Sequence, residues 1–182
     1  MPPSAPSDEL AARLAGARLL ALDVDGVLTD GRVVYVGETE AQAFHVHDGA
    51  AFAWLREAGV EIAWISGRGC AATKRRAEEL GVRELLLHAR PKAAALAAVQ
   101  ARLAIPAAGT VVMGDDLHDL ELAAGAAVFA CPADARPEVR ARADIVTAAR
   151  GGAGAVRELA ELILRAKGTW DRRVAGSGRE AE

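Results

Sequence analysis

The sequence predicts an α/β fold, in which helices cover both faces of a mostly parallel β-sheet. Three observations predict it. Short apolar stretches suited to buried strands alternate with helical segments of about ten residues. Glycine, proline or aspartate separates most of these segments, as expected of turns and helix ends. The chain has 182 residues and is 52% hydrophobic, enough for one domain with a sizeable core.

The N-terminal part is expected to form a helix, a buried strand and a projecting hairpin. The helix spans residues 8–15 and is capped by one of the two polar residues at its start. Residues 18–22 are apolar and suit the first buried strand. Turn-forming residues separate the extended segments 32–36 and 43–46, which we therefore expect to pair as a hairpin.

A regular alternation of helices and strands follows the hairpin. Asp48 can cap a helix that runs to residue 58, with Gly59 just past its end. The remaining elements are strands at 61–65, 84–87, 110–113, 127–130 and 145–146, and helices at 70–80, 91–103, 117–124, 137–143 and 155–167. Helices between successive strands imply right-handed crossovers and a parallel sheet.

Composition excludes several classes of function. The net charge of −3 lacks the basic excess that a nucleic-acid partner requires, and no apolar run is long enough to span a membrane. The N-terminus does not resemble a signal peptide, so we expect a cytoplasmic protein. We divide the chain into a tail with a short helix (1–17), one domain (18–167) and a flexible, polar C-terminal tail (168–182).

Polar side chains follow four of the predicted strands at the points where the strands end. Asp23 and Asp25 come directly after the first strand, Ser66 and Asp115 follow two others, and Lys92 lies near the start of a helix. The carboxyl ends of parallel strands share one edge of a sheet, which is where ligands bind. In an extended chain Asp23 and Asp25 would also point to the same side.

These residue types suit phosphoryl transfer, which depends mainly on positioning and on charge neutralisation. We expect Mg²⁺ to be held by Asp23, Asp25 and Asp115, together with waters and a backbone carbonyl. Ser66 and Lys92 would then donate to phosphate oxygens. Asp23 would attack phosphorus, and Asp25 would protonate the departing alcohol and later deprotonate the attacking water.

The order of these motifs resembles the haloacid dehalogenase superfamily of phosphatases, and within it the branch that dephosphorylates 3-deoxy-D-manno-octulosonate 8-phosphate. The resemblance covers about residues 19–164. The segments that carry it are 23–31, 44–49, 65–68, 114–119, 133–137, 142–147 and 154–158. The second segment and the last are specific to the branch.

The resemblance implies a capless, Rossmann-like phosphoric monoester hydrolase that requires Mg²⁺. Its hairpin, residues 31–46, would pack with its copies in a homotetramer, so that neighbouring subunits close each other's active sites. Its product would feed lipopolysaccharide synthesis. Implied substrate contacts are His45, Val46, His47, Asp48, Gly49, Gly67, Arg68, Arg76 and Lys92, and implied supporting residues are Asp116 and Asp119.

Several positions depart from the branch pattern. His45 and His47 replace an asparagine and an arginine, Ala53 replaces a basic residue, and Leu87-His88 replaces Gln-Gly. These changes concern recognition of the sugar acid, so an N-acylneuraminate or ketodeoxynonulosonate 9-phosphate is an alternative substrate. The two histidines lie in a predicted strand and face one side, where we expect substrate contact, with a transition-metal pair or a structural pair as alternatives.

Two other classes of protein share parts of this pattern. A signalling receiver domain also uses aspartates, a hydroxyl and a lysine, but its acidic pair precedes the phosphoacceptor and its lysine comes last. A non-catalytic assembly domain of the same superfamily tends to lose the nucleophile. This chain keeps Asp23 and Asp25 and places Asp115 and Asp116 after Lys92, which favours the phosphatase.

Overall fold

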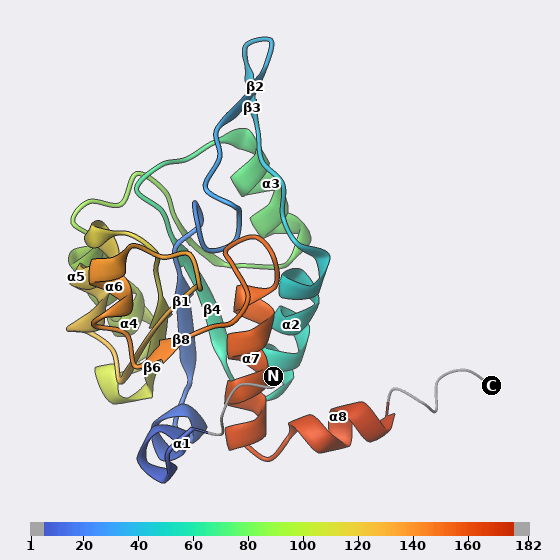
Figure 1. Ribbon diagram of the computed structural model, residues 1–182, viewed down its shortest axis with the longest axis vertical. Coiled ribbons are helices and arrows are strands. Elements are labelled where there is room, and N and C mark those ends of the chain that lie inside the picture. The colour runs from blue at the N-terminus through green and yellow to red at the C-terminus, as the bar shows by residue number, and fades with distance from the viewer. Residues whose placement is uncertain (1–5, 177–182) are drawn as a thin grey trace.

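A computed structural model, which describes residues 6–176, confirms the α/β fold (Figure 1). Its centre is a six-stranded sheet with the strand order β5-β4-β1-β6-β7-β8. These strands are β1 (Leu19–Leu22), β4 (Glu61–Ile65), β5 (Glu84–Leu86), β6 (Thr110–Met113), β7 (Val128–Cys131) and β8 (Ile145–Val146). All pairings within the sheet are parallel, so a crossover connects each strand to the next.

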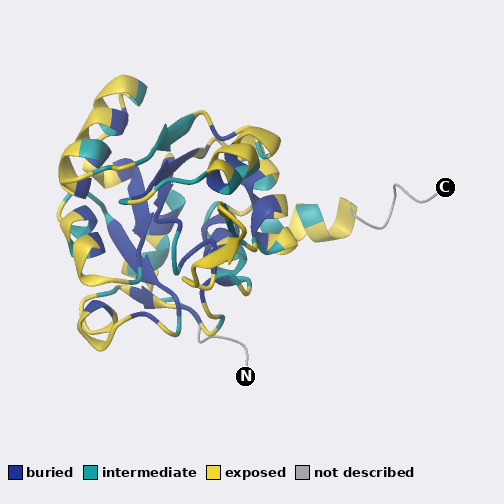
Figure 2. Cartoon of the chain, turned by 90° about the horizontal axis from the view of Figure 1, so that it is seen from above, coloured by how far each residue is buried: buried dark blue, intermediate teal, exposed yellow. Residues whose placement is uncertain are grey.

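Helices cover both faces of this sheet. One face carries α1 (Asp8–Ala15), α2 (Val46–Glu57), α3 (Ala71–Glu79) and α7 (Ala155–Ala166). The other carries α4 (Lys92–Leu103), α5 (Leu120–Ala123) and α6 (Pro137–Arg140), with the short 3-10 helices η1 (Ala107–Gly109) and η2 (Leu117–Asp119) in the connections. Side chains alternate along β1, so Leu20 packs against the first group and Leu19 against the second. Figure 2 shows the resulting buried layer at the centre.

The hairpin projects beyond the sheet, but its second strand begins earlier than predicted. β2 (Val34–Val36) pairs in antiparallel fashion with β3 (Thr39–Ala41). Gly37 adopts a φ of +62°, and this left-handed conformation allows the chain to reverse within a tight turn. The prediction of a second strand at 43–46 is therefore wrong, because this segment leads from the completed hairpin into α2.

Asp48 has a different structural role from the predicted one. α2 already begins after His45, so Asp48 lies in its first turn and does not cap it. Its Oδ1 instead accepts a hydrogen bond of 2.7 Å from the backbone N–H of Arg157 in α7. The N-cap of α7 is Gly154, which has no side chain to supply an acceptor. Asp48, buried and 1% exposed, therefore caps α7 from a neighbouring helix.

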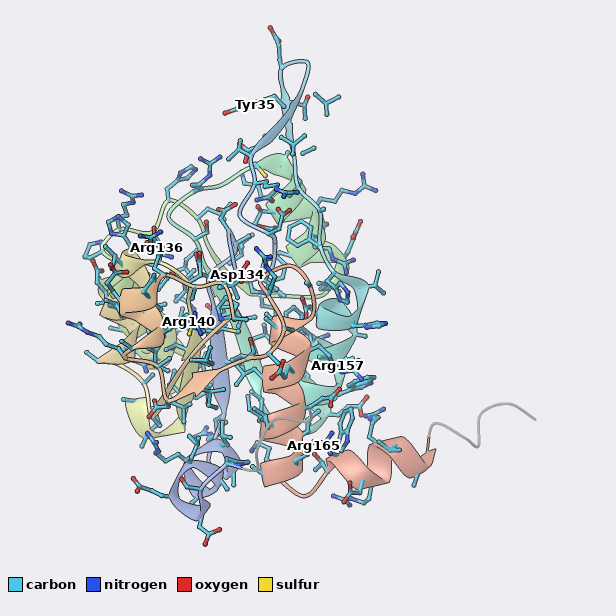
Figure 3. All side chains as sticks on the ribbon, in the orientation of Figure 1. Tyr35, Asp134, Arg136, Arg140, Arg157 and Arg165 are labelled. Carbon is cyan, nitrogen blue, oxygen red and sulfur yellow. The ribbon has the colours of Figure 1, made fainter. Side chains whose placement is uncertain are left out.

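A further helix, α8 (Trp170–Gly176), occupies part of the C-terminal segment that is predicted to be a flexible tail. The ring of Trp170 lies 6.0 Å from that of Trp54. Arg157 and Arg165 extend from α7 toward these rings, with the guanidinium of Arg157 4.1 Å from the Trp54 ring (Figure 3). Residues 177–182, also predicted to be flexible, lie outside the described residues. Within residues 6–176, no helix combines the length and apolar character needed to cross a membrane.

We expect Asp48→Ala to lower the free energy of unfolding by about 1–2 kcal/mol, because it removes the acceptor that caps α7. Asp48→Asn is the matched control, since its side-chain oxygen can still accept the hydrogen bond from Arg157. Urea denaturation followed by circular dichroism measures both variants. Equal losses for the alanine and asparagine variants would contradict the capping role.

Candidate active site

The predicted catalytic residues come together at the carboxyl edge of the sheet. Asp23 and Asp25 follow β1, Ser66 follows β4, and Asp115 follows β6, while Lys92 is the first residue of α4 after β5. These four strands are neighbours in the order β5-β4-β1-β6, so their ends converge. All five side chains line one cavity of about 630 Å³, which Gly67, Arg68, Asp116 and Asp119 also line.

Lys92 connects two carboxylates at the base of the cavity. Its Nζ donates to Oδ1 of Asp23 at 2.7 Å and to Oδ1 of Asp119 at 2.5 Å. The lysine is only 7% exposed, and burial by itself would lower its pKa. The charges of Asp23 and Asp119 outweigh burial and raise the pKa above its ordinary value. Lys92 is therefore held as a cation inside the protein.

Asp119 also shapes the loop after β6. Its Oδ2 accepts hydrogen bonds from the backbone N–H groups of Asp115 at 2.9 Å and Asp116 at 3.1 Å. The Asp116 carboxylate in turn accepts from the N–H of Leu117 and caps η2. Since Asp119 uses one oxygen for Lys92 and the other for this loop, it fixes Asp115 relative to Asp23.

The carboxylates of Asp23 and Asp115 lie in an environment that disfavours their ionisation. Burial raises the pKa of Asp115 to about 8, and the charges of Asp119 and Asp23 add to this effect. Burial and the charge of Asp119 likewise raise the pKa of Asp23 to about 7, although Lys92 opposes the shift. Additional positive charge at this point would keep both groups ionised.

The geometry fits a hard divalent cation. Carboxylate oxygens of Asp23, Asp115 and Asp119 lie within 4.8 Å of one another, and Oδ1 of Asp115 is buried without a hydrogen-bond partner among residues 6–176. Mg²⁺ prefers oxygen ligands of this kind. The approach of Asp115 also requires Gly26, because a Cβ there would lie 2.2 Å from Oδ2 of Asp115.

Asp25 lines the same cavity but is not one of the three clustered carboxylates, although in an extended chain it would point to the same side as Asp23. The chain leaves β1 at Asp23 and turns immediately, with N–H groups of Leu28 and Thr29 bonded to the carbonyl of Val24. Oδ1 of Asp25 accepts a hydrogen bond of 2.9 Å from Nε2 of Gln42. The carboxylate of Asp25 thus contacts Gln42, while that of Asp23 contacts Lys92.

Two further polar groups face the other oxygen of Asp25. Oγ of Ser66 lies 3.5 Å from Oδ2 and also accepts a hydrogen bond of 3.0 Å from the N–H of Arg68. Nε of Arg68 forms an ion pair of 3.8 Å with the same oxygen, and its Nη2 binds Glu40 of the hairpin at 2.9 Å. The arrangement surrounds Asp25 with donors.

Gln42 is a site residue that no feature of the sequence indicated. It lies in the segment between β3 and α2, one residue before the strand that was predicted at 43–46, and no motif in the sequence includes it. Its short distance to Asp25 depends on the folding back of the hairpin over 17 residues of sequence. No spacing pattern in the sequence could have indicated this contact.

A second group of predicted residues lies outside the cavity lining. His45, Val46, His47, Asp48 and Gly49 form the start of α2. The predicted strand with both histidines on one side is therefore wrong, although their rings do meet, with centroids 5.0 Å apart. The guanidinium of Arg76 covers Gly49, where a Cβ would lie 2.6 Å from Nη2. In one chain, these residues do not reach the carboxylate cluster.

Comparison with known proteins reveals close relatives, although no family model matches the chain. The sequence is 37% identical over 167 residues to the 3-deoxy-D-manno-octulosonate 8-phosphate phosphatase KdsC of Escherichia coli K12. That alignment covers 91% of this chain and 88% of the relative. Identity at this level over nearly the whole of both chains indicates common descent and a common fold.

Solved structures agree with this relationship. The 3-deoxy-D-manno-octulosonate 8-phosphate phosphatase of Moraxella catarrhalis, in complex with a magnesium ion, a phosphate ion and a KDO molecule, superposes with a TM-score of 0.90 at 36% identity. The superposition covers 94% of this chain and 99% of that one. A putative HAD superfamily (subfamily III A) hydrolase from Legionella pneumophila gives a TM-score of 0.89 at 32% identity, covering 95% and 96% of the two chains. The chain therefore belongs to the 3-deoxy-D-manno-octulosonate 8-phosphate phosphatase family of the haloacid dehalogenase superfamily.

Proposed function

We propose that this protein is a magnesium-dependent phosphatase that hydrolyses 3-deoxy-D-manno-octulosonate 8-phosphate to 3-deoxy-D-manno-octulosonate and phosphate. The observation that carries the proposal is the buried cluster of Asp23, Lys92, Asp119 and Asp115, in which one Asp115 oxygen has no hydrogen-bond partner in the described part of the chain. Carboxylates that surround a lysine beside a cation site suit the binding and transfer of a phosphoryl group. The identity to KdsC relatives supports the choice of substrate.

Asp23 is the residue that we assign as nucleophile. It attacks phosphorus and forms an aspartyl-phosphate, while the sugar hydroxyl leaves. Lys92, fixed 2.7 Å from Asp23, offsets the negative charge that develops on the phosphoryl oxygens. Ser66 donates its hydroxyl to one of these oxygens. Mg²⁺ would be held by Asp23 and Asp115 together with a main-chain carbonyl, and it would supply the remaining positive charge.

Asp25 is the residue that we assign as acid and base. It gives its proton to the leaving sugar oxygen, and it then removes a proton from the water that hydrolyses the aspartyl-phosphate. Its position between Gln42, Ser66 and Arg68 supports this role, because these contacts hold the carboxylate at the wall of the cavity that Asp23 also lines. Arg68 and Gly67, which also line the cavity, are proposed to contact the substrate.

We further propose that the functional form is a homotetramer built through the hairpin. The tip is apolar and exposed, with Val34 at 48%, Tyr35 at 72% and Val36 at 65% (Figure 3). A two-stranded hairpin cannot bury such residues by itself, whereas packing of its copies around a symmetry axis would bury them. In that assembly the hairpins and the start of α2 help to close the cavities of neighbouring subunits.

The proposed compartment is the cytoplasm, and the proposed catalytic domain spans residues 18–167. Cys70 and Cys131 are both free thiols, which agrees with a reducing compartment. The elements that carry the cluster, β1 through α5, all lie within this domain.

We expect Asp23→Asn to reduce kcat for phosphate release by about 10³-fold or more, because the amide cannot form the aspartyl-phosphate. Asp25→Asn should reduce kcat by about 10²–10⁴-fold through loss of acid and base catalysis. Asp30→Asn, an exposed aspartate of the same loop, is the control and should retain full activity. Malachite-green detection of phosphate with Mg²⁺ present measures all three. A folded wild-type protein that releases no phosphate would instead support an assembly domain.

A panel of phosphorylated sugar acids tests the substrate. We expect kcat/KM for 3-deoxy-D-manno-octulosonate 8-phosphate to exceed that for nine-carbon 9-phosphates by at least about tenfold, a difference of ~1.4 kcal/mol in transition-state binding. The comparison is informative because His45 and His47 depart from the family pattern. A preference for N-acylneuraminate 9-phosphate would overturn the proposed substrate while leaving the phosphatase chemistry in place.

Light scattering tests the assembly. We expect the wild-type protein to show a mass about four times that of the 18.9 kDa chain. A Tyr35→Asp/Val36→Asp variant should dissociate, because two charges would be buried among the packed hairpins. Val174→Asp introduces the same charge at an exposed apolar residue of α8 and should leave the mass unchanged. A monomeric wild type would rule out the proposed tetramer.

A further inference from the structure

We infer that Gln42 is a positioning residue for Asp25, and that through it the hairpin sets the geometry of acid and base catalysis. This inference rests on the proposed function, in which Asp25 exchanges protons with the sugar oxygen and with water. Gln42 makes a hydrogen bond of normal length with this carboxylate, since Nε2 donates to Oδ1 at 2.9 Å. The distances from Oδ2 to Ser66 and Arg68 are longer, 3.5 and 3.8 Å.

The amide of Gln42 is held in one orientation. Its Oε1 accepts a hydrogen bond of 2.6 Å from Oγ1 of Thr73 and one of 3.2 Å from Sγ of Cys70. Thr73 is 2% exposed and lies in the first turn of α3. A flipped amide would point its oxygen at the carboxylate of Asp25 and place two acceptors in contact. The N–H of Gln42 therefore faces Asp25, because its carbonyl oxygen is already occupied by the donors of Thr73 and Cys70.

This orientation distinguishes the two oxygens of Asp25. Oδ1 must accept the hydrogen bond from Gln42, because a side-chain amide N–H can only donate. Oδ2 is then the oxygen that carries the exchanged proton, and it lies on the side of Ser66 and Arg68, two residues of the cavity wall. Gln42 would thus hold the carboxylate in the rotamer that aims Oδ2 at the substrate.

The hairpin contributes to this geometry through two nearby residues. Gln42 binds Asp25 directly, while Glu40 of β3 binds Nη2 of Arg68, whose Nε lies 3.8 Å from Asp25. At the other end of the segment, Phe44 stacks on the buried Trp64, with ring centroids 6.1 Å apart. The return segment of the hairpin is therefore anchored on both sides of Gln42, which gives it the rigidity that a positioning residue requires.

The test compares two substrates whose leaving groups differ in their need for a proton. Gln42→Met keeps the length of the side chain and removes its donor. The alcohol of 3-deoxy-D-manno-octulosonate 8-phosphate must be protonated as it leaves, whereas the nitrophenolate of p-nitrophenyl phosphate leaves without a proton. We expect kcat/KM to fall about tenfold for the sugar phosphate and less than about threefold for the aryl phosphate. Ala43→Ser, at the adjacent exposed position, should change neither value.

A double-mutant cycle shows whether Gln42 acts through Asp25. In the Asp25→Asn background, Gln42→Met should cause no further loss for the sugar phosphate, because the proton-exchanging group is already absent. If Gln42→Met does not fold, Thr73→Val keeps the amide but releases its orientation, and we expect a loss of about twofold to fivefold with the same substrate dependence. Circular dichroism establishes the fold of each variant.

The outcomes separate this inference from the proposed function. Equal losses for the two substrates, or losses that multiply with Asp25→Asn, would overturn the role of Gln42 and leave the phosphatase intact. Absence of turnover by the folded wild-type protein would overturn the proposed function, and the inference about Gln42 with it. A selective loss for the sugar phosphate that disappears in the Asp25→Asn background supports both.

Discussion

The buried contact of Lys92 with Asp23 and Asp119 is the interaction on which the rest of the site depends. Three carboxylates converge where β1 and β6 end, and burial and the neighbouring negative charges raise the pKa of two of them, Asp23 and Asp115. Lys92 offsets part of this effect, since its ammonium binds one oxygen of each partner. A buried charge cluster is costly unless its members are paired, so the arrangement is better explained by catalysis than by stability.

The two ends of the hairpin have different roles. Its tip exposes apolar side chains that suit packing against other copies of the chain, while its return segment holds polar residues that reach Asp25. An element that is short and poorly buried can have a fixed geometry only if both ends are anchored. Gln42 and Phe44 provide the anchor within the chain, and assembly would provide the other. The proposed assembly would thus be linked to the orientation of a carboxylate in the cavity.

The start of α2 combines a structural role with departures from the family pattern. Asp48 caps α7, and Gly49 allows Arg76 to cross the helix closely, so both positions are constrained by packing. His45 and His47 are more exposed and lie beside these fixed positions, where substitution costs little stability. The histidines can therefore differ from the family pattern while the capping of α7 and the carboxylate cluster remain as they are.

The sequence by itself determined the order of strands and helices, the parallel sheet, and the residue types at the strand ends. These features follow from local periodicity and from the rule that parallel strands share one carboxyl edge, which brings Asp23, Ser66, Lys92 and Asp115 together. Only the tertiary structure decided the contacts that depend on turns and on chain reversal. Because the turn at Gly37 is tight, the second hairpin strand begins earlier in the sequence than predicted. The turn after Asp23 places Asp25 within hydrogen-bond distance of Gln42. Contacts of this kind arise from dihedral angles at a few residues, and apolar periodicity carries no information about them.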